Sequence, residues 1–180
     1  MVYCFLANGF EETEAIAPID ILRRSEIKVV TVGIGEEVVV SSHGVAVIPD
    51  ITEVDFVPTE ELEMILLPGG MPGTLNLEKS RTVRDAIDYC VKNDRYIAAI
   101  CAAPSILGKM DLLVGKKATC FPGFEKFLNG AEVSDALTVR DGKIITAKGA
   151  GAAIEFGLTL SAALAGEETA AKVREAIQCR

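Results

Sequence analysis

The chain has 180 residues, 49% of them hydrophobic, and its 18 basic and 26 acidic residues give a formal net charge of −8. At this length a chain buries roughly 70% of its unfolded surface, so we expect one domain over residues 1–180 that folds without disulfides or metals. The acidic balance and the lack of a basic run argue against a specific nucleic-acid partner. No apolar stretch approaches the roughly 18 residues of a membrane span, and the N-terminus lacks a charged leader, so we expect a cytoplasmic protein with no membrane partner.

Strand-like and helix-like segments alternate along the chain. In order, we predict a strand over 2–6, a helix over 11–24 bent at Pro18, strands over 27–34, 37–42, 45–48 and 62–67, a helix over 78–92, a strand over 96–100, a helix over 104–110, a hairpin over 138–140 and 143–146, and helices over 152–164 and 167–177. Short, near-continuously apolar strands between helices predict an α/β fold with a mostly parallel sheet covered on both faces.

Three of the predicted strands end in segments that carry chemistry. These segments are residues 8–14, residues 68–73 and Cys101. Ligands of parallel sheets bind beyond the carboxyl ends of the strands. We therefore expect the three segments to converge on one rim of the sheet.

The five cysteines lack CxxC spacing, and an odd number without that spacing indicates free thiols in a reducing compartment. They are Cys4, Cys90, Cys101, Cys120 and Cys179. We expect Cys4 and Cys90 in or near the core and Cys179 in a frayed tail. Cys120 is a weaker candidate for a place near the rim.

Cys101 stands where a strand turns into a helix. The positions two before and two after it are Ala99 and Ala103, which meets the steric need of a nucleophile elbow for small residues there, and Pro104 suits the first turn of a helix. The unpaired amides and dipole at a helix N-terminus contribute up to ~2 kcal/mol to a thiolate, or ~1.5 pKa units. The pattern alone leaves open the alternative of a buried cysteine that acts as a small hydrophobe.

A partner for Cys101 must come from a short list. The single histidine, His43, lies in a turn-like Ser-His-Gly where a solvated side chain is the ordinary case, and Ala102 follows the cysteine, so a Cys-His-Glu glutaminase or protease is poorly supported. Of the acidic residues in GFEETE, Glu14 is the one whose spacing turns it inward, while Glu11 and Glu12 suit a helix N-terminus. Burial beside a thiolate should raise the pKa of Glu14 so that it donates a hydrogen bond to sulfur.

The glycine-rich LPGGMPG lacks the GxxxxGK[ST] pattern of a phosphate loop, and a tight turn is the simplest alternative. Gly70 in this segment can bring its backbone N–H next to Cys101. Together with the N–H of Ala102 it would form an oxyanion hole.

Four segments together resemble one family: GFEETE with the following PIDILRR, LPGGMPGTLNL, AAICAAP and GAGAAIEFGL. They resemble the ThiJ/PfpI superfamily, whose domain is of the class I glutamine-amidotransferase-like type, in the branch of a human parkinsonism-linked protein and its bacterial relatives. The resemblance implies a flavodoxin-like parallel sheet sandwiched between helices, a nucleophile elbow at Cys101 and a homodimer. It assigns Cys101 as nucleophile, Glu14 as its protonated partner, and Gly70 and Ala102 as the oxyanion hole.

Four further residues are expected near the site or the dimer contact, namely Arg24, His43, Gly69 and Phe121. His43 stands where close relatives often have arginine, and Phe121 stands where the human protein has histidine. Ala147 and Ala150 replace a serine and a proline. These departures put the shape of the pocket, and with it the substrate, in question.

The resemblance implies a glyoxalase or protein deglycase that converts methylglyoxal, glyoxal or their early adducts to 2-hydroxy acids, with no metal or organic cofactor. The alternative is a redox-sensing, stress-protective, chaperone-like protein whose Cys101 is oxidised to sulfinate. A third reading is an amidotransferase-like domain that receives a histidine base from a partner.

Overall fold

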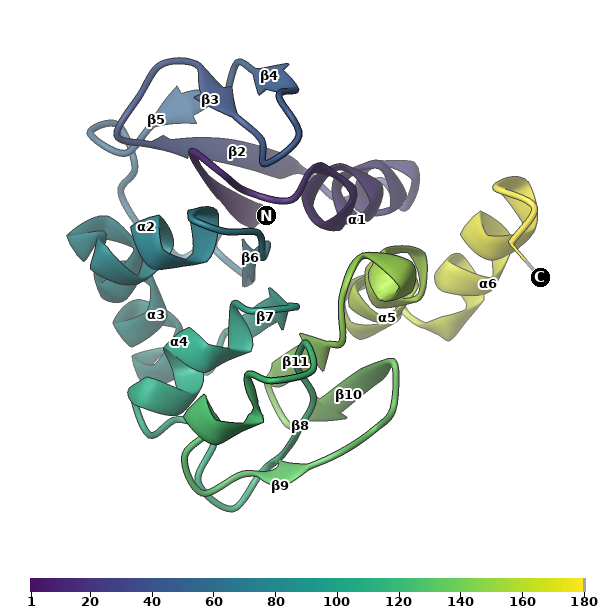
Figure 1. The fold of residues 1–180 in the computed structure, drawn as a ribbon. Helices are drawn as coiled ribbons and strands as arrows, with labels where there is room; N and C mark the ends of the chain where they lie inside the picture. Colours follow the sequence, from purple (N-terminus) through teal and green to yellow (C-terminus); the bar gives the residue numbers. More distant parts are fainter. Residues whose placement is uncertain (180) are drawn as a thin grey trace.

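The structure is a computed structural model that describes residues 1–179 (Figure 1). Its centre is a seven-stranded sheet in the order β10-β11-β7-β6-β1-β2-β5. The strands of this sheet are β1 (Val2–Ala7), β2 (Val29–Ile34), β5 (Ile51–Thr52), β6 (Met64–Leu67), β7 (Tyr96–Ile100), β10 (Thr138–Asp141) and β11 (Ile144–Ala147). Two short pairs lie outside it, β3 (Val39–Val40) with β4 (Ala46–Val47) and β8 (Lys117–Ala118) with β9 (Glu132–Val133).

Helices cover both faces of the sheet. They are α1 (Glu12–Arg24), α2 (Gly73–Lys79), α3 (Arg81–Lys92), α4 (Pro104–Lys109), α5 (Ala153–Ala165) and α6 (Glu167–Ala176), with 3-10 turns at Glu125–Phe127 and Ala150–Ala152. In Figure 1, α2, α3 and α4 lie on one side of the sheet and α1, α5 and α6 on the other. The predicted α/β, flavodoxin-like sandwich is confirmed.

The strands are apolar along their whole length because each central strand has two covered faces. All six residues of β1 are buried, and β1 pairs in parallel with both β2 and β6. Side chains of alternate strand residues then enter two separate cores. One core includes Phe5, Val83 and Leu107, on the side of α3 and α4, and the other includes Leu6 and Phe156, on the side of α5. Apolar burial on both faces is the main stabilising contribution to such a sheet.

Most predicted elements are present, and the predicted hairpin is β10 and β11, which pair antiparallel. The helix predicted over 78–92 is wrong, because the chain breaks at Ser80. Ser80 has extended backbone angles of φ −69° and ψ 126°, and its Oγ accepts a hydrogen bond from the Val83 amide at 3.3 Å. It caps α3, while α2 ends just before it. The strands predicted over 37–42 and 45–48 shorten to the two-residue pairs of β3 and β4.

The cysteines are free thiols, and Cys4 and Cys90 are fully buried, as predicted. Pro18 lies buried within α1, which is assigned as one continuous helix, so the bend there stays a prediction. Over residues 1–179, none of the helices combines the length and the apolarity required to cross a membrane.

Candidate active site

The three segments predicted to converge do meet at one rim of the sheet. Strands β1, β6 and β7 are parallel neighbours, so their carboxyl ends lie side by side. The Gly69 amide, just after β6, donates to Glu14 Oε2 at 3.0 Å. The carboxyl group of Glu14 is also hydrogen-bonded to Cys101, just after β7. Residues from the ends of three strands therefore form one cluster.

Cys101 occupies a strained elbow. Its φ is +65°, in the left-handed region that non-glycine residues rarely enter. Hydrogen bonds hold it there: its amide donates to the Ala147 carbonyl at 2.9 Å, and its carbonyl accepts from the Phe121 amide at 2.8 Å. Ala99 and Ala103 are fully buried on either side, which is the steric reason for small residues at these positions. The predicted elbow geometry is present.

Glu14 reaches Cys101 from the first turn of α1. Glu11 caps that helix, its Oε2 accepting from the Glu14 amide at 2.7 Å, and this turn points the Glu14 side chain inward, where it is 1% exposed. A Cβ at Gly69 would lie 2.5 Å from Glu14 Oε2 and 2.6 Å from the Cβ of Cys101. The missing side chain of Gly69 is therefore what lets the carboxyl group and the thiol lie next to each other.

The two groups control each other's protonation. Burial raises the pKa of Glu14 to about 7, although hydrogen bonds from Cys101 and from the Gly69 and Ala150 amides lower it. Burial also raises the pKa of Cys101 to about 12, and the charge of Glu14 and its hydrogen bond add to this rise. Two negative charges in contact inside a buried site are strongly disfavoured. Around neutral pH the pair therefore loses its first proton and keeps its second.

The amides of Gly70 and Ala102 are directed at the Cys101 sulfur and lower the pKa of its thiol, as the sequence predicts. The net change in the pKa of the thiol is nevertheless upward. The sequence around Cys101 reveals only the effect of the helix N-terminus, which lowers the pKa. Burial and the neighbouring Glu14 carboxylate raise the pKa by more than the two amides lower it. Both amides nevertheless donate toward the Cys101 sulfur, and their role as an oxyanion hole stays a prediction.

The four additional candidates separate into two groups. Gly69 and Phe121 contact the Glu14–Cys101 pair directly. His43 is exposed, with Nδ1 3.0 Å from Glu12 Oε1, so it pairs with the outer side of the α1 N-terminus. Arg24 lies at the other end of α1, and its Nε donates to Asp20 Oδ2 at 2.7 Å. At about 1.5 Å per helical residue this is more than two turns from Glu14, so Arg24 is not part of the site within one chain.

One group of side chains has the composition of a metal site. Ligand atoms of Glu11, Glu12 and His43 lie within 4.8 Å of one another. Glu11 already caps α1, and the Glu12–His43 ion pair accounts for the other two. The group lies outside the Glu14–Cys101 pair.

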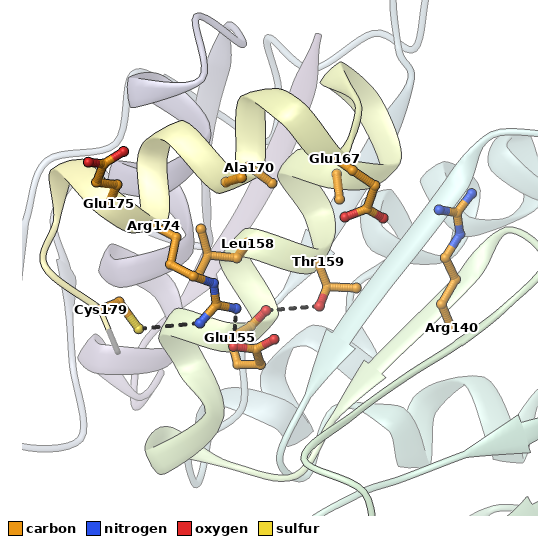
Figure 2. A pocket seen from close by; sticks show the side chains of 11 residues that line it. Arg140, Glu155, Leu158, Thr159, Glu167, Ala170, Arg174, Glu175 and Cys179 are labelled. Atoms are coloured by element: carbon orange, nitrogen blue, oxygen red, sulfur yellow. Dashed lines mark hydrogen bonds and ion pairs between the residues drawn. The ribbon is translucent and has the colours of Figure 1, made fainter.

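A separate cavity of about 650 Å³ lies between α5, α6 and β10 (Figure 2). Arg174 spans its wall, paired with Glu155 and donating to Cys179 Sγ at 3.7 Å. Arg140 and Glu167 lie on the other side of the opening in Figure 2. Neither Cys101 nor Glu14 lines this cavity, so its size does not bear on the chemistry of the site.

Sequence reasoning missed Gly149 and the amide of Ala150, which complete the site beside Glu14. They follow β11, whose last residue, Ala147, accepts a hydrogen bond from the Cys101 amide, and the Ala150 amide donates to the Glu14 carboxyl group. The glycines of GAGAA were the one available signal.

A parallel α/β sandwich with a strained cysteine at a strand–helix elbow, paired with a buried glutamate, defines a flavodoxin-like protein with a cysteine-centred site. The chain belongs to the DJ-1/PfpI family, whose profile matches residues 1–163. It is 38% identical over 175 residues to protein dj-1beta of Drosophila melanogaster, covering 96% of this chain and 93% of that one. It is 32% identical over 161 residues to the glutathione-independent glyoxalase DJR-1.2 of Caenorhabditis elegans, covering 88% and 84%.

Solved structures agree with this assignment. The crystal structure of Drosophila melanogaster DJ-1beta matches with a TM-score of 0.94 at 35% identity, covering 99% of this chain and 97% of that one. The oxidized DJ-1 of Toxoplasma gondii matches with a TM-score of 0.93 at 33% identity, covering 98% and 97%.

Proposed function

We propose that this protein is a cofactor-independent glyoxalase that converts methylglyoxal and glyoxal to 2-hydroxy acids, and that it acts on their early protein adducts as a deglycase. The observation that carries the proposal is the buried Glu14 carboxyl group, hydrogen-bonded to the Cys101 thiol at a strained elbow, beside two amides aimed at the sulfur. A nucleophile and a proton carrier in contact are what an internal redox reaction between adjacent carbons needs. The name of the C. elegans relative supports the same reaction class.

In the first step the Cys101 proton passes to the Glu14 carboxylate through the hydrogen bond that joins the two groups, which gives a thiolate beside a protonated Glu14. The Cys101 thiolate attacks the aldehyde carbon, C1, and a carbon–sulfur bond forms as the carbonyl π bond breaks. The Gly70 and Ala102 amides, which face the sulfur in the resting site, stabilise the new alkoxide. The proton of Glu14 then neutralises it, which gives a hemithioacetal and a free Glu14 carboxylate.

The second step moves hydrogen between carbons. The Glu14 carboxylate removes the proton from C1, which leaves an enediolate and a protonated Glu14. Glu14 returns that proton to C2, and the proton of the C1 hydroxyl passes to the C2 oxygen as the C1 carbonyl re-forms. C1 is thereby oxidised to a thioester while C2 is reduced to an alcohol, so no external electron carrier is needed. Water hydrolyses the thioester, which releases the 2-hydroxy acid and restores the thiol.

The test is 2-hydroxy-acid formation from methylglyoxal by the wild type and by Cys101→Ser. Product rather than aldehyde loss must be quantified, because a thiol depletes aldehyde by reversible addition alone. Cys179→Ser is the matched control, since it removes a partly exposed thiol outside the site. Product over many turnovers in the wild type and the control, and none in Cys101→Ser, supports the enzyme. Product that persists in Cys101→Ser rejects it.

A second function rests on the same thiol. Cys101 would be oxidised to sulfinate, whose oxygens accept from the two amides and from protonated Glu14, and the protein would sense or resist oxidative stress. The T. gondii relative is described as oxidized. Intact mass after peroxide treatment tests this: addition of two oxygen atoms in the wild type and not in Cys101→Ser supports it.

The assembly belongs to the proposal too: a cytoplasmic homodimer of single-domain chains, residues 1–180. Helices α1 and α5 pack side by side, and each exposes a large apolar side chain, Ile16 on α1 and Ile154 on α5. Exposed apolar residues on adjacent helices suit an interface between copies. Light scattering on the purified protein measures the mass; a monomer at micromolar concentration contradicts a stable dimer.

A further inference from the structure

Glu11 occupies the N-cap of α1, a position where glutamate is an unusual choice. Asn, Asp and Ser are the preferred residues there, because their short side chains reach the free amides of the first turn. Glu11 nevertheless makes this bond, since its Oε2 accepts from the amide of Glu14, three residues further on, at 2.7 Å. A shorter or a neutral side chain would cap the helix as well, so capping alone does not account for a glutamate at this position.

Three hydrogen bonds join Glu11, Glu14 and Gly69 in a ring. The Glu11 amide donates to the Gly69 carbonyl at 3.0 Å, the Gly69 amide donates to Glu14 Oε2 at 3.0 Å, and the Glu14 amide donates back to Glu11 Oε2. A Cβ at Gly70 would collide with the Glu11 nitrogen, so glycine there lets the segment after β6 lie against the N-terminus of α1. The ring fixes Glu14 at both ends, its amide through Glu11 and its carboxyl group through Gly69.

The negative charge of Glu11 acts on the acid of the pair. After burial, this charge is the next influence that raises the pKa of Glu14, whereas the pKa of Cys101 is raised mainly by burial and by Glu14 itself. The other groups that face the Glu14 carboxyl group are the Cys101 thiol and the amides of Gly69 and Ala150, and all three stabilise its charged form. A charge that opposes the ionised form of Glu14 makes its carboxylate a better acceptor for the proton of Cys101.

We propose that Glu11 is a positioning residue for the Glu14–Cys101 pair: it holds Glu14 in place through the ring, and its negative charge favours transfer of the Cys101 proton to Glu14. The inference rests on the first step of the proposed function, which is that proton transfer, and names the residue that promotes it. The thiolate is the nucleophilic form of cysteine. Without the charge of Glu11, a smaller share of the pair is thiolate beside protonated Glu14 at neutral pH, so Cys101 reacts more slowly with any electrophile.

Glu11→Gln tests the charge, because glutamine keeps an oxygen that accepts from the Glu14 amide and loses only the negative charge. We expect alkylation of Cys101 by iodoacetamide at pH 8 to slow by about 3-fold or more, the factor that corresponds to about half a pKa unit, and the midpoint of its pH profile to move to lower pH. Glu12→Gln is the matched control, since it changes the net charge equally at the next residue, where the carboxylate pairs with His43. It should leave the profile unchanged.

Glu11→Asp and Glu11→Ala separate the charge from the placement of the acid. Aspartate keeps the charge and is a preferred N-cap residue, so Glu11→Asp should restore the alkylation profile and the turnover of the wild type. Alanine removes both the charge and the acceptor of the Glu14 amide. Since a displacement of about 1 Å between reacting groups costs about 100-fold in rate, kcat for methylglyoxal should fall at least about 10-fold further in Glu11→Ala than in Glu11→Gln. Glutamine and aspartate both keep the cap, so these two variants decide the matter even if Glu11→Ala fails to fold.

The alkylation profile does not depend on turnover, so the inference and the function beneath it can fail separately. A Glu11→Gln profile that matches the wild type overturns the inference while the glyoxalase stands. Slowing of equal size in Glu12→Gln also overturns it, because any charge at the end of the helix would then have the same effect. A wild type that forms no 2-hydroxy acid overturns the glyoxalase alone, and the alkylation profiles still decide how Glu11 acts on the pair.

Discussion

The carboxyl group of Glu14 is buried against the Cys101 thiol and hydrogen-bonded to it, although the two residues come from different strand ends. Neither group is in its ordinary environment, because burial raises the pKa of both. The pair behaves as one acid with two dissociations. Its consequences for stability and for reactivity can be measured separately.

The stability of the fold should fall as the pH rises from about 4.5 to about 7. The pKa of Glu14 is raised from 4.5 to about 7 in the folded state, so within that window the folded protein holds a proton that the unfolded chain has lost. The contribution of this proton to stability is complete below pH 4.5, the ordinary pKa, and is lost as the pH rises through about 7, the pKa in the folded state. At about 1.4 kcal/mol per pKa unit it amounts to about 3 kcal/mol. Urea unfolding of the wild type and Glu14→Gln across this range measures it.

Glutamine does not titrate, so the difference in unfolding free energy between the two proteins should change with pH. Two curves that run parallel from pH 4.5 to 8 would show that Glu14 titrates normally in the folded protein.

Removing the carboxyl group of Glu14 should distinguish its role as proton carrier from the role of Cys101 as nucleophile. In Glu14→Gln we expect turnover of methylglyoxal to fall at least about 100-fold, since proton transfer by a positioned acid or base contributes that much. The pKa of Cys101 should move down at the same time, because the charge of Glu14 and its hydrogen bond both raise it. Alkylation of Cys101 at pH 8 should therefore be faster than in the wild type. A variant that keeps its turnover and its fold would remove Glu14 from the mechanism.

The sequence predicts those parts of the site whose residues lie within a few positions of one another in the chain. Ala99 and Ala103 reveal the elbow at Cys101, and the turn after Glu11 reveals the inward Glu14. Phe121 was expected near the site only through the family resemblance, and Gly149 was not expected. Cys101 makes backbone hydrogen bonds to Phe121 and to Ala147, segments far apart in the chain, and no local pattern records such contacts. The pKa of Cys101 was misjudged for the same reason, because its main cause is burial by the whole fold.

The fold shows the same division. The central strand Tyr96–Ile100 is predicted to the residue, whereas β1 runs one residue longer than predicted and β2 and β6 each begin two residues later. The predicted helix begins too early, at residue 78, because Val83 and Ile87 set the periodicity of α3 but do not mark its first residue. Ser80 is nevertheless a standard N-cap residue, and its position one residue before α3 was readable from the sequence.

The contribution of the Ser80 cap to the stability of the fold can be measured. Ser80→Ala removes the acceptor of the Val83 amide, so the free energy of unfolding should fall by about 1 kcal/mol, the usual effect of losing an N-cap. Turnover should stay unchanged, because the Ser80 hydroxyl bonds to the Val83 amide and to Glu53 and not to Glu14 or Cys101. Ser134→Ala serves as control, since the Ser134 hydroxyl accepts from the Ala136 amide in an exposed loop. Equal stability of the two variants would mean that the cap at Ser80 contributes nothing.

Gly69 offers the most direct test of contact between the acid and the thiol. In Gly69→Ala the added Cβ falls 2.5 Å from Glu14 Oε2 and 2.6 Å from the Cβ of Cys101. The Cys101 Cβ is fixed to the elbow backbone, so the Glu14 carboxyl group is the one displaced. Overpacking of this kind costs about 1–3 kcal/mol of stability, and a displacement of about 1 Å between reacting groups costs about 100-fold in rate. We therefore expect a folded but less stable protein whose turnover is lost.

The same variant separates misplacement from simple destabilisation. Gly151→Ala adds a methyl group that meets nothing nearby and should match the wild type in both stability and rate. Pushing Glu14 from Cys101 removes the hydrogen bond and weakens the charge that raise the thiol pKa, so the pH profile of Cys101 alkylation should move to lower pH. A destabilised variant with an unchanged alkylation profile and normal turnover would mean that the close contact of the two groups is a packing feature and not part of the reaction.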